Sequence, residues 1–165
     1  MSAITREFDE SDDEGDPNTV RRRTVPAGVE VYEINGPFFF GAAEKFKETM
    51  TGMHRMSRVP ILRMRNVPAV DSTALNALRD VIARVRGAGA RVILSDVHAQ
   101  PMVAIRRSAL SDELPEEDLV GNIDDALNLA LAHLGLAPVP RPDFAVPTVA
   151  REQARGPSVQ PPEAR

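Results

Sequence analysis

VPILRMRNVPAVDSTALNAL, residues 59–78, changes from a strand pattern to a helix pattern within one short stretch. Residues 59–64 are mostly apolar, which is typical of a strand buried on both faces. From Ser72 onward the apolar positions recur at offsets of three and four, the spacing of one helix face: Leu75, Leu78, Ile82 and Val85. Gly87 and Gly89 are of the residue type that commonly ends a helix. A buried strand followed by such a helix indicates an α/β fold.

The sequence on either side of this stretch repeats the alternation. Strand patterns lie over residues 29–34 and 91–96, and helix patterns over 42–56, 101–108 and 123–134. Strands that alternate with helices need crossover connections, which make the strands parallel. We therefore predict an α/β sandwich with a mostly parallel sheet of four or five strands, right-handed crossovers and helices mainly on one side. The first strands can pair antiparallel at one edge.

Composition narrows the class of protein. The chain has 165 residues, 42% of them hydrophobic and 4% aromatic, which suits one domain with an aliphatic core. It has no cysteine, so we expect no disulfides, no thiolate metal site and a reducing compartment. A net charge of −4 argues against nucleic acid as a partner. We see neither a signal peptide nor an apolar run long enough to cross a bilayer.

The two ends differ from the middle. Seven of the ten residues 7–16 are acidic, and such a block repels itself, so we predict a flexible acidic arm over residues 1–18. Seven of the fourteen prolines follow Ala137, so we predict a disordered Pro-rich tail over 138–165. The ordered domain is expected at 19–137. Its arginines 21–23 either neutralise the arm or flank an edge strand, or else they contact anionic lipid or a partner.

Three polar residues, Asp71, Ser72 and Thr73, stand where the central helix begins. In one interpretation Asp71 or Ser72 only caps the helix, a contribution of about 1 kcal/mol. In the other, Ser72 or Thr73 is a phosphorylation site, since a helix N-terminus accommodates negative charge. Asp71 would repel such a phosphate.

Phe38, Phe39 and Phe40 form a second notable group. We expect two of the rings in the core, with the middle one packed under the first helix. The alternative is one exposed ring that docks on a membrane domain or on a second protomer.

Other candidate chemistry is sparse. Asp96 and His98 follow the strand at 91–96, a common place for a site in α/β folds. They form no recognisable nucleophile arrangement with Ser95. His54, His98 and His133 are far apart in sequence. We therefore expect no enzyme activity, no cofactor and no metal site.

The chain resembles a STAS domain over about residues 24–134. The resemblance rests on VEVYEINGPFFFGAAEKF, on VPILRMRNVPAVDSTALNAL and on RVRGAGARVILSDVHAQ. STAS domains occur in anti-sigma factor antagonists and at the cytoplasmic C-terminus of SulP sulphate and other anion transporters. The three-Phe segment and the acidic stretch before it are more like the transporter branch.

The resemblance also implies roles for particular residues. Antagonists carry Asp-Ser-Ser/Thr-Gly, and the hydroxyl residue before the Gly is phosphorylated by an anti-sigma kinase. That position is Thr73, but Ala74 stands where the Gly would be. The family has also been proposed to bind nucleotides, and the chain has no Gly-rich phosphate loop, so nucleotide is a weak expectation.

Two functions follow. The first is a non-catalytic cytoplasmic regulatory domain of a SulP-type transporter, on the cytoplasmic side of the inner membrane. Its partners would be the membrane domain of the same transporter, a second STAS domain or a cytoplasmic regulatory protein. The candidate partner surface holds Phe38, Phe39, Phe40, Asp96 and His98. The alternative is a free-standing anti-sigma factor antagonist in a partner-switching cascade.

Overall fold

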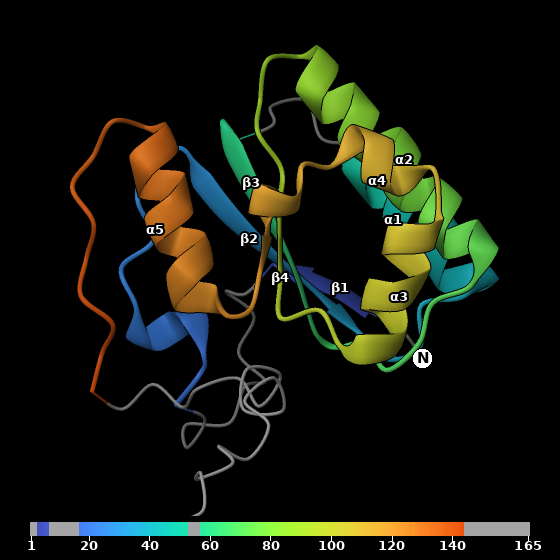
Figure 1. Cartoon of the computed structure of the whole chain (residues 1–165), viewed down its shortest axis with the longest axis horizontal. Helices are drawn as coiled ribbons and strands as arrows, with labels where there is room; N and C mark the ends of the chain where they lie inside the picture. The colour runs from blue at the N-terminus through green and yellow to red at the C-terminus, as the bar shows by residue number, and fades with distance from the viewer. Residues whose placement is uncertain (1–2, 7–16, 53–56, 144–165) are drawn as a thin grey trace, which may run out of the picture.

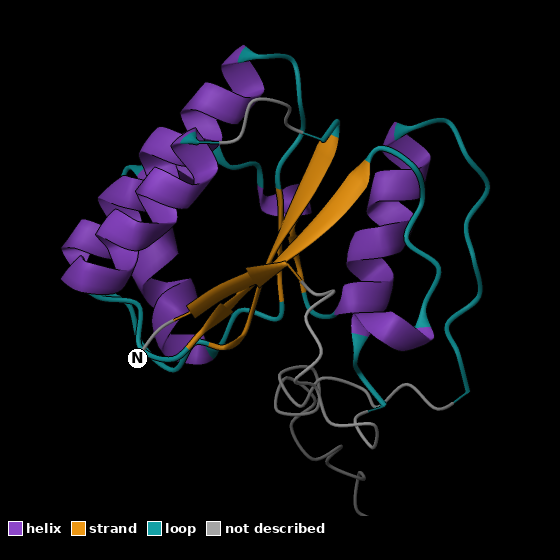
Figure 2. Ribbon diagram, turned by 180° about the vertical axis from the view of Figure 1, so that it is seen from behind, coloured by secondary structure: helices purple, strands orange, loops and turns teal. Residues whose placement is uncertain are grey.

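The computed structural model describes residues 3–6, 17–52 and 57–143, which form one sheet with helices on both faces (Figure 1). The sheet has five strands in the order β1-β2-β3-β4-β5. Four of them run parallel and β1 pairs antiparallel with β2. Figure 2 shows the strands in orange between the helices in purple. The strands are β1 (Ala3–Arg6), β2 (Val29–Asn35), β3 (Val59–Asn66), β4 (Ile93–Ser95) and β5 (Leu119–Val120). The prediction of a mostly parallel α/β sheet of four or five strands is confirmed.

The helices are divided unequally between the two faces of the sheet. Figure 1 shows α1, α2, α3 and α4 on one side of the sheet and α5 on the other, in agreement with the prediction of helices mainly on one side. They are α1 (Phe40–Thr51), α2 (Ser72–Gly87), α3 (Ala99–Arg107), α4 (Leu110–Glu113) and α5 (Ile123–His133). Two short 3-10 helices, η1 (Val20–Arg22) and η2 (Glu116–Asp118), complete the connections. Among the described residues, no helix is both long and apolar enough to cross a bilayer.

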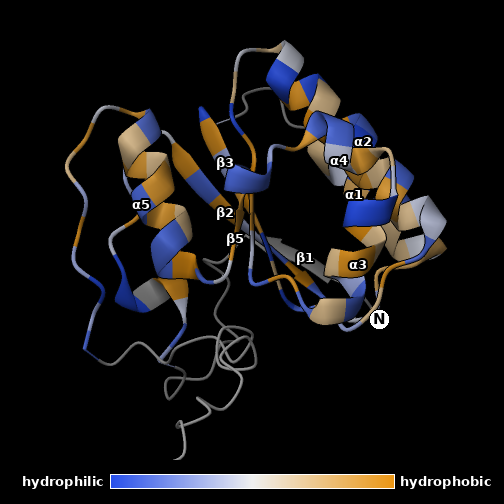
Figure 3. Ribbon diagram, in the orientation of Figure 1, coloured by the Kyte–Doolittle hydropathy of each residue, from blue (hydrophilic) through white to orange (hydrophobic). Residues whose placement is uncertain are grey.

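Each face of the sheet has its own apolar core. Leu62 and Met64 of β3 belong to the cluster that includes α1 and α2, whereas Ile61 belongs to the cluster under α5. Successive side chains on a strand point to opposite faces of the sheet. Because helices cover both faces of β3, both faces need apolar residues. This explains the apolar run at the start of β3, whose first six residues are all buried. Figure 3 shows the hydrophobic residues gathered where the helices meet the sheet.

Helix boundaries follow local signals in the sequence. α2 ends at Gly87, and Gly89 has a φ of +85°, a conformation that glycine adopts without strain. α1 begins at Phe40, two residues before the expected start, and residues 53–56 lie outside the described part of the chain. α3 begins at Ala99, so Pro101 lies in its first turn, as expected.

Two expectations about the chain ends need correction. Ala3–Arg6, in the segment expected to be a flexible arm, forms β1, because the unpaired edge of β2 offers it backbone hydrogen bonds. The tail expected from 138 onward packs on α5 at its start, where the amide of Asn128 bonds the N–H and the carbonyl of Val139 over 2.8 and 2.9 Å. Residues 7–16 and 144–165 lie outside the described chain, and the domain boundaries remain a prediction.

Candidate functional site

The N-termini of α1, α2 and α3 meet at the edge where β2, β3 and β4 end. Phe38, just before α1, forms a parallel bridge with Val70, just before α2. The N–H of Phe38 donates to the carbonyl of Ala69 over 3.0 Å, and the N–H of Asp71 donates to the carbonyl of Phe38 over 3.3 Å. The three-Phe segment and the Asp-Ser-Thr segment therefore form one continuous edge.

Asp71 is the N-cap of α2. Its Oδ1 accepts from the N–H of Ala74 over 2.8 Å, and its own backbone is extended. This leaves Ser72 exposed and Thr73 half-buried, while Ala74 is completely buried. The capping role therefore belongs to the carboxylate, and the exposed hydroxyl of Ser72 lies in the first helical turn.

The three phenylalanines have different environments. Phe38 is fully buried and packs edge-on against Phe46, with ring centroids 5.5 Å apart. Phe39 and Phe40 are 46% and 65% exposed, so the expectation that two rings lie in the core is wrong. The reason is that α1 starts at Phe40, and only Ala43, Phe46 and Met50 lie on its inner face. Phe39 and Phe40 are therefore two neighbouring exposed aromatic side chains at this edge.

The start of α3 closes the other end of this edge. The side-chain amide of Gln100 brackets Val70, accepting from its N–H over 3.0 Å and donating to its carbonyl over 3.3 Å. His98 is the exposed residue before α3, and its Nε2 contacts the carbonyl oxygen of Arg65. An open groove of about 570 Å³ lies here, lined by Arg65, Asn66, Pro68, His98, Ala99 and Gln100.

Two residues of the expected partner surface are not on the surface. Phe38 fills the core between α1 and the sheet, and Asp96 is 9% exposed. Asp96 turns inward because its Oδ2 accepts from the Nε of Arg63, a fully buried side chain, over 3.2 Å. Phe39, Phe40 and His98 are the members of the predicted set that the structure leaves exposed, and Ser72, in the first turn of α2, is exposed as well.

Buried charges near this edge were not anticipated. Glu33, 2% exposed, accepts from the Nε of Arg65 over 2.5 Å and from the amide of Asn66 over 3.0 Å. Together with the Arg63–Asp96 pair, these interactions tie β2, β3 and the end of β4 to one another. The available signal was the presence of charged residues inside otherwise apolar strands, since such residues must be paired when buried.

Comparison with known proteins fits this architecture. A family model described as STAS domain matches residues 21–127, which is more than half of the chain. The chain belongs to the STAS domain family. Among curated proteins, no match was found.

Three solved structures are similar. A sulfate transporter family protein from Wolinella succinogenes is 38% identical, with a TM-score of 0.68, over 73% of this chain and 98% of that one. The SulP transporter STAS domain from Vibrio cholerae is 27% identical, with a TM-score of 0.60, over 72% and 94%. A putative anti-sigma factor antagonist from Thermotoga maritima shares the fold at 14% identity and a TM-score of 0.52, over 62% and 87%.

Proposed function

We propose that this chain is a non-catalytic regulatory and interaction domain of a SulP-type secondary anion transporter, held on the cytoplasmic side of the inner membrane. The main support is the similarity to the Wolinella succinogenes protein, which covers 98% of that chain at 38% identity. The coverage matters because nearly the whole length of the Wolinella succinogenes chain is compared.

The edge described above is the proposed docking surface. Exposed aromatic side chains are unfavourable in water and are enriched where proteins meet. Phe39 and Phe40 would contact the membrane domain of the same transporter, with Ser72 and His98 as polar neighbours. A second STAS domain or a cytoplasmic regulatory protein would be the occupant if the membrane domain is not.

One observation favours a second candidate, an anti-sigma factor antagonist controlled by phosphorylation. The hydroxyl of Ser72 is exposed at a helix N-terminus, where phosphate would be stabilised by the helix dipole. Against it, Ala74 is buried, and its side chain occupies the place where the antagonist motif has glycine. Thr73, the residue that the resemblance selects, is only partly accessible.

The first step of the test is to read the natural coding sequence around residue 1 and to ask whether it encodes membrane-spanning segments. Sulphate uptake into membrane vesicles is then measured with the natural protein that contains this chain, as wild type and as the Phe39→Ser, Phe40→Ser double variant. We expect reduced uptake at an unchanged amount of folded protein. Unchanged uptake would refute the docking surface. An open reading frame without membrane spans, together with phosphate incorporation at Ser72 or Thr73 by an anti-sigma kinase, would favour the antagonist.

A further inference from the structure

Two buried arginines hold the segment that enters the domain. The carbonyl oxygens of Pro17 and Thr19 accept from Nη1 of Arg23 over 3.0 and 2.8 Å. The carbonyl between them, that of Asn18, accepts from Nη2 of Arg63 over 2.7 Å. Three successive backbone carbonyls are therefore bound by guanidinium groups from two different parts of the chain.

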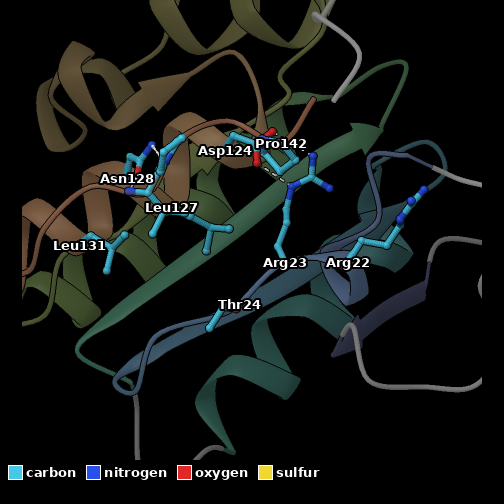
Figure 4. A pocket seen from close by; sticks show the side chains of 10 residues that line it. Arg22, Arg23, Thr24, Asp124, Leu127, Asn128, Leu131 and Pro142 are labelled. Atoms are coloured by element: carbon cyan, nitrogen blue, oxygen red, sulfur yellow. Dashed lines mark hydrogen bonds and ion pairs between the residues drawn. The ribbon is translucent and has the colours of Figure 1, made fainter. Parts of the chain in front are cut away.

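Each of these arginines is also paired with a carboxylate. Arg23 makes two contacts with Asp124 at the start of α5, Nε to Oδ1 over 2.6 Å and Nη2 to Oδ2 over 2.9 Å. Figure 4 shows the head of Arg23 directed at Asp124, in the wall of a cavity of about 350 Å³. Side-chain exposure is 3% for Arg23 and 9% for Asp124. The paired carboxylates fix the orientation of both guanidinium planes.

The Arg63 pair leads to the proposed docking edge. Asp96, its partner, has a φ of +58°, a left-handed conformation that a non-glycine residue keeps only when its surroundings hold it there. The surroundings are Arg63 and the hydrogen bond from the N–H of Asp96 to the carbonyl of Val120, over 3.1 Å. Two residues later, His98 precedes α3, whose Gln100 brackets the residue before Asp71. The backbone at Asp96 thus sets where α3 begins.

We propose that residues 17–19 are an N-terminal latch that couples the incoming chain to the α3 edge. When these residues leave, the guanidinium groups of Arg63 and Arg23 lose three backbone acceptors, and charged donors that lose acceptors must turn toward other partners or water. Arg63 then shifts away from Asp96, the left-handed turn relaxes, and the first turn of α3 loosens. A displacement of the segment before the domain is thereby felt at the first turn of α3, at one end of the exposed edge. The coupling lies within the chain and does not depend on which partner binds there.

Hydrogen exchange of the full chain tests the latch through amides that are hydrogen-bonded in the structure. The reporters are Arg23, Asp96 and Met102, and the reference amides are Ala43 and Leu75, at the starts of α1 and α2. Arg63→Lys keeps the charge but cannot hold two acceptors in the same planar arrangement. We expect exchange about tenfold faster at all three reporters and little change at the references.

Arg91→Lys is the matched control. Arg91 also pairs with a largely buried carboxylate, Asp118, over 2.7 Å, and contacts Glu117 over 3.0 Å. In this variant the reporters should exchange as in the wild type. Equal acceleration at reporters and references in Arg63→Lys, or acceleration at Arg23 without Asp96 and Met102, would overturn the proposal.

A second measurement needs no variant and so is independent of whether Arg63→Lys folds. Exchange of the wild-type chain is followed in low concentrations of urea, where segments that open together share one opening free energy and one dependence on urea. We expect Arg23, Asp96 and Met102 to exchange as one such unit. Different urea dependences for Arg23 and for the Asp96 and Met102 pair would show that the latch and the α3 edge open separately.

Discussion

The N–H of Asp71 donates to the carbonyl oxygen of Phe38 over 3.3 Å. The residue that caps α2 is therefore also bonded to the residue that precedes the exposed pair Phe39 and Phe40. The two groups are separated by more than thirty residues in sequence but share one edge of the fold. A change at either group is therefore expected to be felt by the other. The first predictions concern this edge.

Asp71→Ala should lower the free energy of unfolding by about 1 kcal/mol, the typical value of a lost N-cap. The reason is that the N–H of Ala74 loses its acceptor while the residue is buried. Ser72→Ala is the control and should change stability by less than about 0.5 kcal/mol, since Ser72 is exposed. Urea denaturation of the three proteins measures both. A larger loss in Ser72→Ala than in Asp71→Ala would contradict the assignment of the cap.

Phe38→Ala should cost about 3–5 kcal/mol, because it removes a fully buried ring and its contact with Phe46. Phe39→Ser should leave stability within about 0.5 kcal/mol of wild type, because that ring is about half exposed. Thermal unfolding followed by circular dichroism separates the two outcomes. Similar losses in both variants would mean that Phe39 is also part of the core.

Ser72→Glu places a negative charge in the first turn of α2, where the helix dipole offsets repulsion from Asp71. We expect an unchanged melting temperature and weaker binding at the proposed docking surface, since a charge there would have to be desolvated on binding. The two measurements are sulphate uptake by the proposed full-length transporter and the melting temperature of the same variant. Ser72→Ala is the control and should behave as wild type in both measurements. Wild-type uptake by Ser72→Glu would mean that residues 71–73 only cap the helix.

The exposed ion pair of Lys47 in α1 with Asp80 in α2 predicts that the stability of the domain depends on pH. A hydrogen bond from Lys47 to Asp80, over 2.7 Å, raises the pKa of Lys47 above 10.5. Because the pKa of Lys47 is higher in the folded than in the unfolded chain, the pair contributes fully to the free energy of unfolding below pH 10.5. This contribution is lost as the pH rises through the pKa of Lys47 in the folded state. The stability difference between wild type and Lys47→Gln should therefore disappear in strongly alkaline buffer, and should shrink in about 1 M salt.

Lys45→Gln is the control for this pair, because Lys45 is exposed on the same helix. Its replacement changes the net charge by the same amount as Lys47→Gln. Its effect on stability should be smaller than that of Lys47→Gln at neutral pH. An equal effect of the two substitutions would assign the difference to net charge and not to the pair with Asp80.

The contact of the C-terminal segment with α5 is also testable. Asn128→Ala removes both hydrogen bonds to the backbone of Val139, and it should speed proteolysis within residues 136–143. Asn76→Ala, at an exposed position of α2, is the matched control and should leave the cleavage rate unchanged. Mass spectrometry of the fragments gives the sites. Unchanged cleavage in Asn128→Ala would mean that the amide does not hold the segment.

Local sequence patterns were enough to predict most of the framework. The alternation of strand and helix predicted the parallel sheet, and the polar residues Asp71 and Ser72 predicted the start of α2, although which of them is the cap was left open. This was possible because a cap acts over only three residues, here from Asp71 to Ala74. Gly89 marked the end of the same helix for a reason equally local, its positive φ. Such features depend on neighbours in sequence, which the sequence displays directly.

Contacts between distant residues were decided only in the tertiary structure. The burial of Arg63, the inward turn of Asp96 and the contact of Arg23 with Asp124 join positions that are 33 or 101 residues apart. The pairing of β1 and the exposure of Phe39 and Phe40 likewise depend on which edge or face the assembled sheet leaves open. A buried charge is stable only when its partner is placed beside it, and that placement exists only once the chain has folded.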